Sequence, residues 1–328
     1  MDDQVRLPWH DALWRQLQRR RAVDRLPHAV LLAGPAGLGK RRFARRLAQA
    51  LLCTLPDTEG DACGQCRSCQ LFQAGSHPDY RLTQPAEEGK VIKIDQIRDL
   101  CAFLGYTPQY GGYKIALLEP ADRLNVNAAN SLLKTLEEPP GDCLLLLATA
   151  QPARLPATVR SRCQTVSFSP PTPEIARSWL KKRIAGALDA AALLDAAGGA
   201  PLLALTYADS ERWQRRRDLA ERYEQVMIGR LDPLRAAEGW MQGDVAENLR
   251  WLVSWQIDVI RLKMSPDPPR LNNPDLRSLL WGWAERQTPR RLFQQLDAAQ
   301  RLQTLCATTQ VRADALLETF LGEASGQP

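Results

Sequence analysis

Gly34, Gly37, Gly39 and Lys40 stand in the stretch GPAGLGKR with the spacing of a phosphate-binding loop. In that motif the backbone amides cradle phosphates, the lysine reaches the outer phosphates, and a Ser or Thr after the lysine binds Mg²⁺. Here Arg41 takes the place of the hydroxyl residue. The loop therefore predicts a nucleotide-type fold. Two alternatives remain for the loop itself. It retains some ATP binding, or it has lost nucleotide binding and keeps only the glycines that its turns require.

A second requirement for hydrolysis can be tested at the end of the apolar segment KIALLEPAD. A P-loop ATPase carries an acidic residue at this point to help hold Mg²⁺, and many carry a second acid beside it. This chain has Glu119 followed by Pro120, which can neither accept a proton nor orient water. Because two separate requirements fail, one at each end of the site, we expect no intrinsic catalysis by this chain.

Four cysteines, Cys53, Cys63, Cys66 and Cys69, have the spacing C-x9-C-x2-C-x2-C. A C-x2-C turn lets two thiolates face one ion, and two further thiolates complete a tetrahedron. With all four ligands supplied by the protein, the pattern predicts a closed, structural zinc site that ties residues 53–69 to the end of the preceding helix. Four unrelated surface thiols are the alternative.

Arg162 lies in the short stretch RSRC, just after the apolar segment LLLLATA and its proline-containing turn. It has two interpretations. It is either an ordinary surface arginine, or, in a ring-forming ATPase, a residue that reaches the nucleotide of a neighbouring subunit.

The elements that must position these residues alternate along the first half of the chain. Five segments have the character of strands: 28–34, 79–85, 113–122, 142–150 and 164–170. Three have the spacing of amphipathic helices: 40–53, 94–106 and 125–140. This alternation predicts a parallel sheet covered by helices on both faces.

Prolines at 170, 171 and 173 mark a boundary, and beyond it the chain reads as helix after helix. We therefore predict an α/β P-loop domain with its zinc module over residues 1–169, a small helical lid over 170–210, and an all-α domain over 211–328. Tryptophans in the last part fit a helix-bundle core. The run Arg215 to Arg217 is interpreted as a solvated helix face.

Taken together, these motifs resemble bacterial clamp-loader subunits of the AAA+ class. The resemblance covers roughly residues 5 to 170. It is carried by the four cysteines, AGSHPDY (74–80), NSLLKTLEEPP (130–140), LLLATAQPARLPATVRSRC (145–163) and the loop at 34–41. Arg41, Pro120 and Leu202, which stands where the motor subunit carries a sensor arginine, single out a non-hydrolysing subunit.

The resemblance implies a place in the clamp loader of DNA polymerase III, with gamma/tau and delta subunits as partners. The sliding clamp and primer-template DNA would be met through the assembled complex. Arg162 would act in trans on the ATP of a neighbouring motor subunit, and residues 211–328 would form the collar. Two alternatives stay open: an active motor subunit, and a P-loop kinase.

Composition sets the remaining limits. The 328 residues carry a formal charge of +6, which permits contact with nucleic acid without requiring it. The N-terminal stretch MDDQVRLPWH does not resemble a signal peptide, and the apolar runs are far short of a membrane span. We expect a cytoplasmic protein with no membrane partner.

Overall fold

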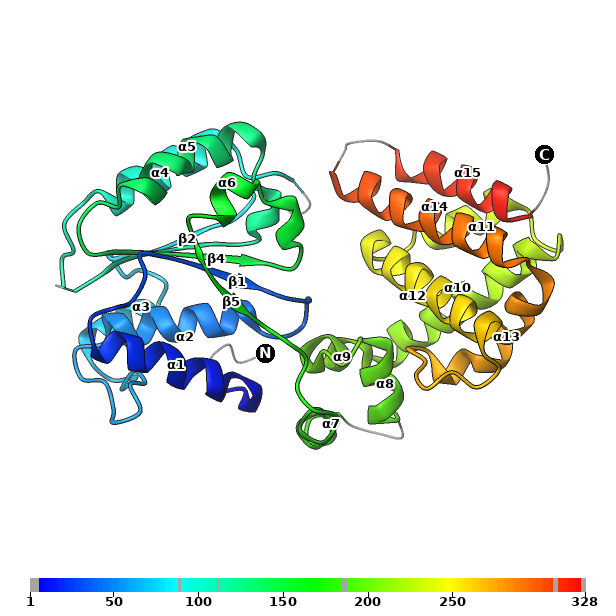
Figure 1. Ribbon diagram of the computed structural model, residues 1–328, viewed down its shortest axis with the longest axis horizontal. Helices are drawn as coiled ribbons and strands as arrows, with labels where there is room; N and C mark the ends of the chain where they lie inside the picture. Colours follow the sequence, from blue (N-terminus) through cyan, green and yellow to red (C-terminus); the bar gives the residue numbers. More distant parts are fainter. Residues whose placement is uncertain (1–5, 88–89, 111, 185–187, 309–311, 326–328) are drawn as a thin grey trace. The chain divides into compact units, whose positions relative to one another are not determined.

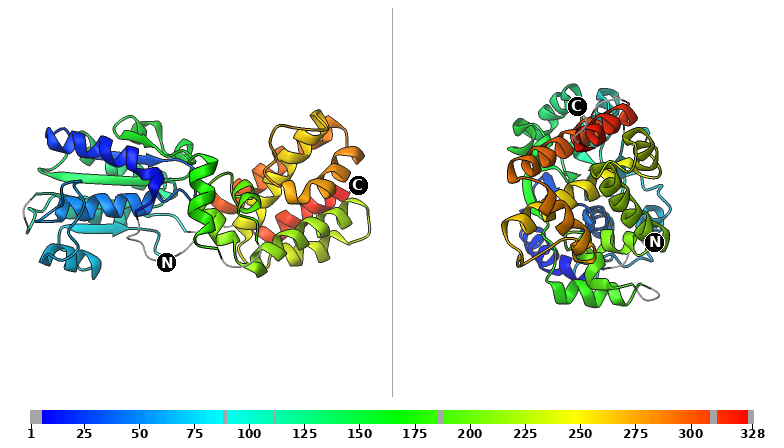
Figure 2. Two further views of the ribbon diagram at one scale, coloured as in Figure 1. Left: turned by 90° about the horizontal axis from the view of Figure 1, so that it is seen from below. Right: turned by 90° about the vertical axis from the view of Figure 1, so that its right-hand side faces the viewer.

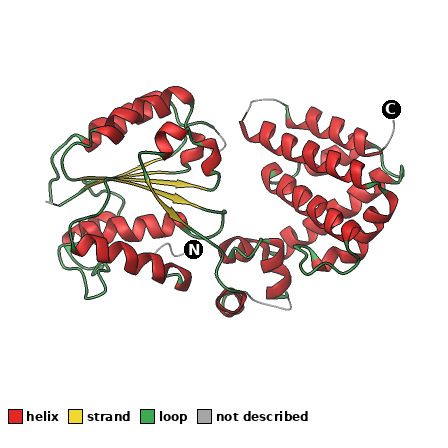
Figure 3. Ribbon diagram, in the orientation of Figure 1, coloured by secondary structure: helices red, strands yellow, loops and turns green. Residues whose placement is uncertain are grey.

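The computed structural model describes residues 6–87, 90–110, 112–184, 188–308 and 312–325. Residue contacts divide the chain into two units, Met1–Pro171 and Thr172–Pro328. Among the described residues, strands occur only in the first unit, and the second is built from helices (Figure 3). The predicted succession of an α/β part and an all-helical part is therefore confirmed.

The first unit is organised around one five-stranded sheet (Figure 1). Its strands are β1 (Ala29–Ala33), β2 (Tyr80–Thr83), β3 (Lys114–Leu118), β4 (Cys143–Thr149) and β5 (Gln164–Ser167). Their order is β2-β3-β4-β1-β5, and all neighbouring strands run parallel. The sheet predicted from the alternating pattern is thus confirmed. Its parallel strands place their carboxyl ends at one edge, where the loops after β1, β3 and β4 meet.

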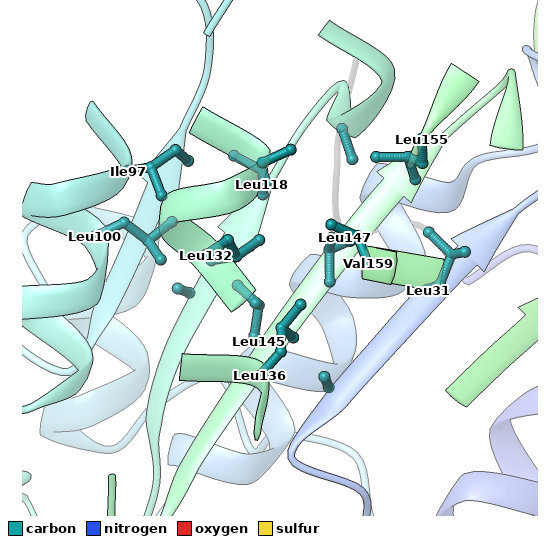
Figure 4. Packing of buried hydrophobic residues seen from close by; sticks show 14 of the residues in the cluster. Leu31, Ile97, Leu100, Leu118, Leu132, Leu136, Leu145, Leu147, Leu155 and Val159 are labelled. Atoms are coloured by element: carbon teal, nitrogen blue, oxygen red, sulfur yellow. The ribbon is translucent and has the colours of Figure 1, made fainter. Parts of the chain in front are cut away.

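Helices cover both faces of this sheet (Figures 1 and 2). One face carries α1 (Asp11–Ala22), α2 (Lys40–Leu52) and α3 (Arg67–Gln73), and the other carries α4 (Ile94–Leu104), α5 (Val126–Glu137) and α6 (Ala157–Arg160). Alternate strand residues point to opposite faces. Leu31, Leu145 and Leu147 therefore pack on the face that α4, α5 and α6 cover. Figure 4 shows Leu145 beside Leu136, and Leu147 and Leu31 close to Val159. Strands β1 and β4 are buried on both faces, which explains why they read as continuous apolar runs in the sequence.

The second unit contains nine helices among the described residues. They are α7 (Pro173–Lys181), α8 (Ala190–Ala196), α9 (Pro201–Tyr207), α10 (Ser210–Met227), α11 (Pro233–Trp240), α12 (Val245–Met264), α13 (Arg277–Arg286), α14 (Pro289–Thr308) and α15 (Ala313–Ser325). Several begin at an aspartate whose carboxylate accepts a first-turn amide, as Asp209, Asp232 and Asp244 do. Leu202 lies in α9. The further division of this unit near residue 210 stays a prediction.

No single described helix has the length and apolar character needed to cross a membrane, and only the bent pair α8 and α9, taken together, meets that test.

Aromatic side chains fill the core of the second unit. Trp240, Trp255 and Trp283 are fully buried, and Tyr223 lies against Trp283 with ring centroids 4.9 Å apart. This confirms the predicted helix-bundle core positions of Trp240, Trp251, Trp255 and Trp283, whereas Trp281, predicted with them, is only partly buried. Aromatic pairs with this edge-to-face geometry add to the stabilisation from buried area.

The solvated face predicted for Arg215 to Arg217 is wrong at its middle residue. Arg216 is fully buried, and it donates to Asp275 at 2.8 Å and to the Asn273 side chain at 2.6 Å. Asn273 in turn donates its backbone amide to Asp258 at 2.7 Å. A buried arginine is tolerated because this network satisfies its charge and donors. The residue therefore fastens the segment before α13 to α10 and α12.

Candidate nucleotide loop, metal centre and surface arginine

The loop between β1 and α2 adopts the turned backbone that its glycines predict. Gly37 and Gly39 have φ of 77° and 84°, in the left-handed region that side chains avoid. At Gly34 a side chain would collide with the backbone carbonyl of Phe168, which comes directly after β5. Glycines are thus required here by the path of the chain, so their presence alone does not demonstrate a bound phosphate.

Lys40 points back into this loop. Its ammonium donates to the carbonyls of Gly34 and Pro35, both at 2.7 Å. Burial lowers the pKa of Lys40 to about 8, while the nearby carboxylates of Glu119 and Asp122 act in the opposite direction. The two loop carbonyls therefore hold the ammonium group where an outer phosphate would otherwise bind it.

The two residues that depart from a hydrolysing P-loop protein are in contact with each other. Arg41, in the first turn of α2, pairs with Glu119, directly after β3, with Nε and Oε2 3.5 Å apart. In the sequence these two departures lie far apart, and each was interpreted as the loss of a separate requirement for hydrolysis. The sheet brings them together because β1 and β3 both end at the same edge, with β4 between them.

Two further residues at this edge were not predicted from the sequence. Thr149, the last residue of β4 and almost fully buried, donates its hydroxyl to Asp122 and accepts the amide of Gln151 at 2.9 Å. Asp122 lies in a 3-10 turn, Ala121–Arg123, that follows Glu119 and Pro120. A polar residue that ends an otherwise apolar strand, as in CLLLLAT, was the available signal.

The segment before α1 also contacts the loop. Trp9 and His10 both bind the carbonyl of Leu38, at 2.9 and 2.8 Å. Burial lowers the pKa of His10 to about 4. The imidazole is therefore neutral and donates to this carbonyl. Trp9 and His10 thus hold the loop at Leu38, while Lys40 holds it at Gly34 and Pro35. Nothing in the local sequence around PWH predicted this contact.

The four cysteines come together as their spacing predicted. Their Sγ atoms all lie within 4.8 Å of one another, with Cys53 and Cys63 3.5 Å apart and Cys63 and Cys69 4.0 Å apart. Thiolates at about 2.3 Å from a tetrahedral zinc would be separated by about 3.8 Å. Backbone amides donate to three of the sulfurs, including Cys66 N to Cys63 Sγ at 3.3 Å. The cluster can hold one metal ion.

A buried polar network joins this cysteine module to the sheet. Ser68 in α3 donates to the Leu52 carbonyl at 2.6 Å and contacts His77 Nε2 at 2.9 Å. His77 Nδ1 accepts the amide of Asp79, and Asp79 pairs with Lys114 at 2.8 Å. Burial alone would raise the pKa of Asp79, but the Lys114 bond and two backbone amides hold it below its usual value. The stretch AGSHPDY is therefore structural.

Arg162 lies outside the loop region, on the surface beyond α6. Its guanidinium pairs with Glu137 at the end of α5, with Nη2 and Oε1 2.6 Å apart, and it donates to the Thr158 carbonyl at 2.9 Å. The Arg162 side chain is 35% exposed and that of Glu137 is 50% exposed. Arg162 also donates to the Ser161 hydroxyl at 3.4 Å. The arginine is therefore held at the surface by one solvated ion pair, one backbone carbonyl and one hydroxyl.

Comparisons with known proteins agree along most of the chain. A family model described as DNA polymerase III, delta subunit matches residues 9–172, and one for the C-terminal part of that subunit matches residues 210–320. The chain is 40% identical over 277 residues to DNA polymerase III subunit delta' of Pseudomonas aeruginosa, covering 83% of both proteins. It is 32% identical over 317 residues to the Escherichia coli delta' subunit, covering 96% of this chain and 93% of that one.

A further relative extends the comparison beyond that subunit. The chain is 35% identical over 154 residues to DNA polymerase III subunit tau of Bacillus subtilis, a match that covers 47% of this chain and 27% of tau.

Proposed function

This chain belongs to the delta-prime family of DNA polymerase III subunits, and from that premise we propose that it is the non-hydrolysing subunit of a clamp loader. The observation that carries the proposal is the loss of both hydrolysis groups at one site, with Arg41 in place of the hydroxyl and Pro120 in place of the second acid. The active motor subunit and the P-loop kinase both need the groups that are lost.

In this proposal the chain works through its neighbours in the cytoplasm. Gamma/tau and delta subunits are its direct partners, and the complex delivers the sliding clamp to primer-template DNA. The similarity to a tau subunit over the first half of the chain supports a common assembly with related subunits. Residues 211–328 supply the collar through which the subunits hold together.

Arg162 is proposed to complete the ATP site of the adjacent motor subunit. A guanidinium is always charged and can bind two phosphate oxygens at once, so it stabilises charge on the transferring phosphoryl group. Its place on the surface supports this role, because its contacts are a solvated ion pair with Glu137, the Thr158 carbonyl and a long bond to the Ser161 hydroxyl. Removing an arginine that acts in this way lowers the rate by about 10³–10⁵-fold at the affected site.

The test is ATP hydrolysis by the reconstituted loader. Arg162→Ala should lower the clamp- and DNA-stimulated rate, while the assembled complex keeps its composition. Arg160→Ala is the matched control, since Arg160 ends α6, two residues before Arg162, and is also exposed. Equal rates for the wild-type and Arg162→Ala loaders would refute the role. The isolated chain should not hydrolyse ATP, and hydrolysis that Lys40→Ala abolishes would identify a motor subunit instead.

The cysteine cluster is proposed to hold one structural Zn²⁺. Four protein sulfurs in a near-tetrahedral set leave no open position for a substrate. The ion would join the end of α2, through Cys53, to the start of α3, through Cys66 and Cys69. Elemental analysis of freshly purified protein should give one zinc per chain, and protein without stoichiometric metal would contradict this assignment.

A further inference from the structure

The ion pair between Arg41 and Glu119 lies where a hydrolysing P-loop protein holds its metal. In such proteins Mg²⁺ is bound by the hydroxyl that follows the loop lysine and by an acid at the end of a nearby strand. Here those two positions carry opposite charges and contact each other at 3.5 Å. The pair is partly sheltered, since the Glu119 side chain is 20% exposed and that of Arg41 is 40% exposed.

We propose that the Arg41 guanidinium takes the place of the metal cation at this site and thereby disfavours the binding of Mg²⁺-nucleotide. This inference rests on the proposed non-hydrolysing function and deepens it, because it names the residue responsible. The metal does not fit the residues present: a guanidinium has only donors and cannot bind a cation, and the one carboxylate that could bind Mg²⁺ is already neutralised.

The charges around the site support this assignment. Two carboxylates face it, those of Glu119 and Asp122, and both act on Lys40. Lys40 and Arg41 supply two positive charges, so the four groups are balanced without a metal. Adding Mg²⁺ would place a divalent charge beside two fixed cations, which is unfavourable in a partly buried site. With a neutral hydroxyl at position 41, the same carboxylates would leave a net negative charge that attracts a cation.

Asp122 is also committed within the protein. It accepts the hydroxyl of Thr149 at the end of β4. Oxygen atoms already engaged as acceptors are poorer ligands for Mg²⁺, which demands near-ideal octahedral geometry and gives up its water reluctantly. Glu119 is thus the carboxylate on which metal binding would depend, and Arg41 is the residue that withdraws it.

The experiment compares nucleotide affinity with excess Mg²⁺ and with EDTA, using a fluorescent ATP analogue and the isolated full chain. For the wild type we expect weaker nucleotide binding with excess Mg²⁺ than with EDTA, because the two fixed cations disfavour the divalent charge. Arg41→Thr supplies the missing hydroxyl and removes the ion pair with Glu119, so Mg²⁺ should strengthen nucleotide binding by this variant by about tenfold or more. Arg41→Ser provides the same hydroxyl if the threonine variant does not fold.

Two further variants make the assignment specific. Arg42→Thr is the matched control, because it removes an arginine from the same helical turn at a position that faces elsewhere; it should behave as the wild type. Adding Glu119→Gln to Arg41→Thr should abolish the gain from Mg²⁺. Circular dichroism and melting temperature establish that each variant is folded.

The outcomes separate this inference from the proposed function. A wild-type chain that binds nucleotide about tenfold tighter with Mg²⁺ would overturn the inference, as would a folded hydroxyl variant that gains nothing from the metal. Neither result touches the role of Arg162 in the loader. Conversely, an Arg162→Ala loader with full ATPase activity would overturn the proposed function and leave the Mg²⁺ comparison standing.

Discussion

Replacing Glu137 by glutamine tests how Arg162 is restrained before it meets a neighbouring subunit. The carboxylate pairs with this guanidinium at 2.6 Å, and both side chains are substantially exposed, at 50% and 35%. If Arg162 must leave Glu137 to reach a nucleotide, the free energy needed to break this ion pair opposes nucleotide binding by Arg162. Glutamine keeps the size of the side chain but removes the charge. The arginine also keeps its bond to the Thr158 carbonyl.

The magnitude follows from the exposure of the pair. Solvated ion pairs contribute about 0.2–1 kcal/mol, which corresponds to a factor of roughly 1.4 to 5 in an equilibrium. We therefore expect Glu137→Gln to raise the loader's ATPase rate at subsaturating motor subunit by up to about fivefold at low salt. Added salt screens exposed charges, so the advantage over the wild type should shrink as ionic strength rises.

The assay is steady-state ATP hydrolysis by the loader, titrated with motor subunit at two salt concentrations. Glu138→Gln is the matched control, because Glu138 is the exposed residue next to Glu137 and this substitution removes the same charge. A rate that falls with Glu137→Gln would refute the reasoning. It would mean that the carboxylate positions the guanidinium rather than competing with the nucleotide for it.

The other predictions concern stability. Arg216→Ala should lower the free energy of unfolding by about 1–3 kcal/mol, because it leaves the buried Asn273 side chain and the partly exposed Asp275 carboxylate without their donor. Arg217→Ala, at an exposed position, should change it by less than about 0.5 kcal/mol in urea titrations. Burial lowers the pKa of His10 in the folded protein from 6.5 to about 4, so the unfolded chain binds more protons between these two pH values. The His10 contribution to the free energy of unfolding should be complete above pH 6.5 and fall by up to about 3 kcal/mol toward pH 4. His10→Gln should reduce this pH dependence of the melting temperature. If the cysteine cluster holds zinc as proposed, Cys66→Ser should lower the zinc content and the melting temperature, while Cys306→Ser, outside the cluster, should leave the zinc content unchanged.

Local patterns in the sequence predicted the parts of this molecule that depend on neighbouring residues. The central strands β1, β3 and β4 were identified because each is buried along its whole length and therefore reads as an apolar run. The edge strands β2 and β5 are only partly buried and carry polar residues. The cysteine cluster was identified because three of its four ligands, Cys63, Cys66 and Cys69, lie within one short segment. In both cases the spacing along the chain carries the geometry, so no knowledge of the folded arrangement was needed.

Contacts between distant residues were not predicted. Arg216 stands in a run of three arginines, and nothing in that run distinguishes the buried one from its neighbours. Its burial depends on Asp275 and Asn273, which lie beyond the end of α12. The pairing of Arg41 with Glu119 was missed for the same reason, since it depends on the order of the strands between them.

Charge balance links the lost hydrolysis groups to the stability of the fold. Simple loss of the metal ligand at position 41 would leave Glu119, a partly buried carboxylate, with less positive charge beside it, and such a carboxylate is costly unless paired. An arginine at this position removes the metal ligand and supplies the compensating charge in one substitution. Arg162 is the opposite case: its partner is well exposed and weakly held, so it can exchange that partner for another anion. We infer that the first arginine closes this chain's own site, while the second remains available to a neighbour's.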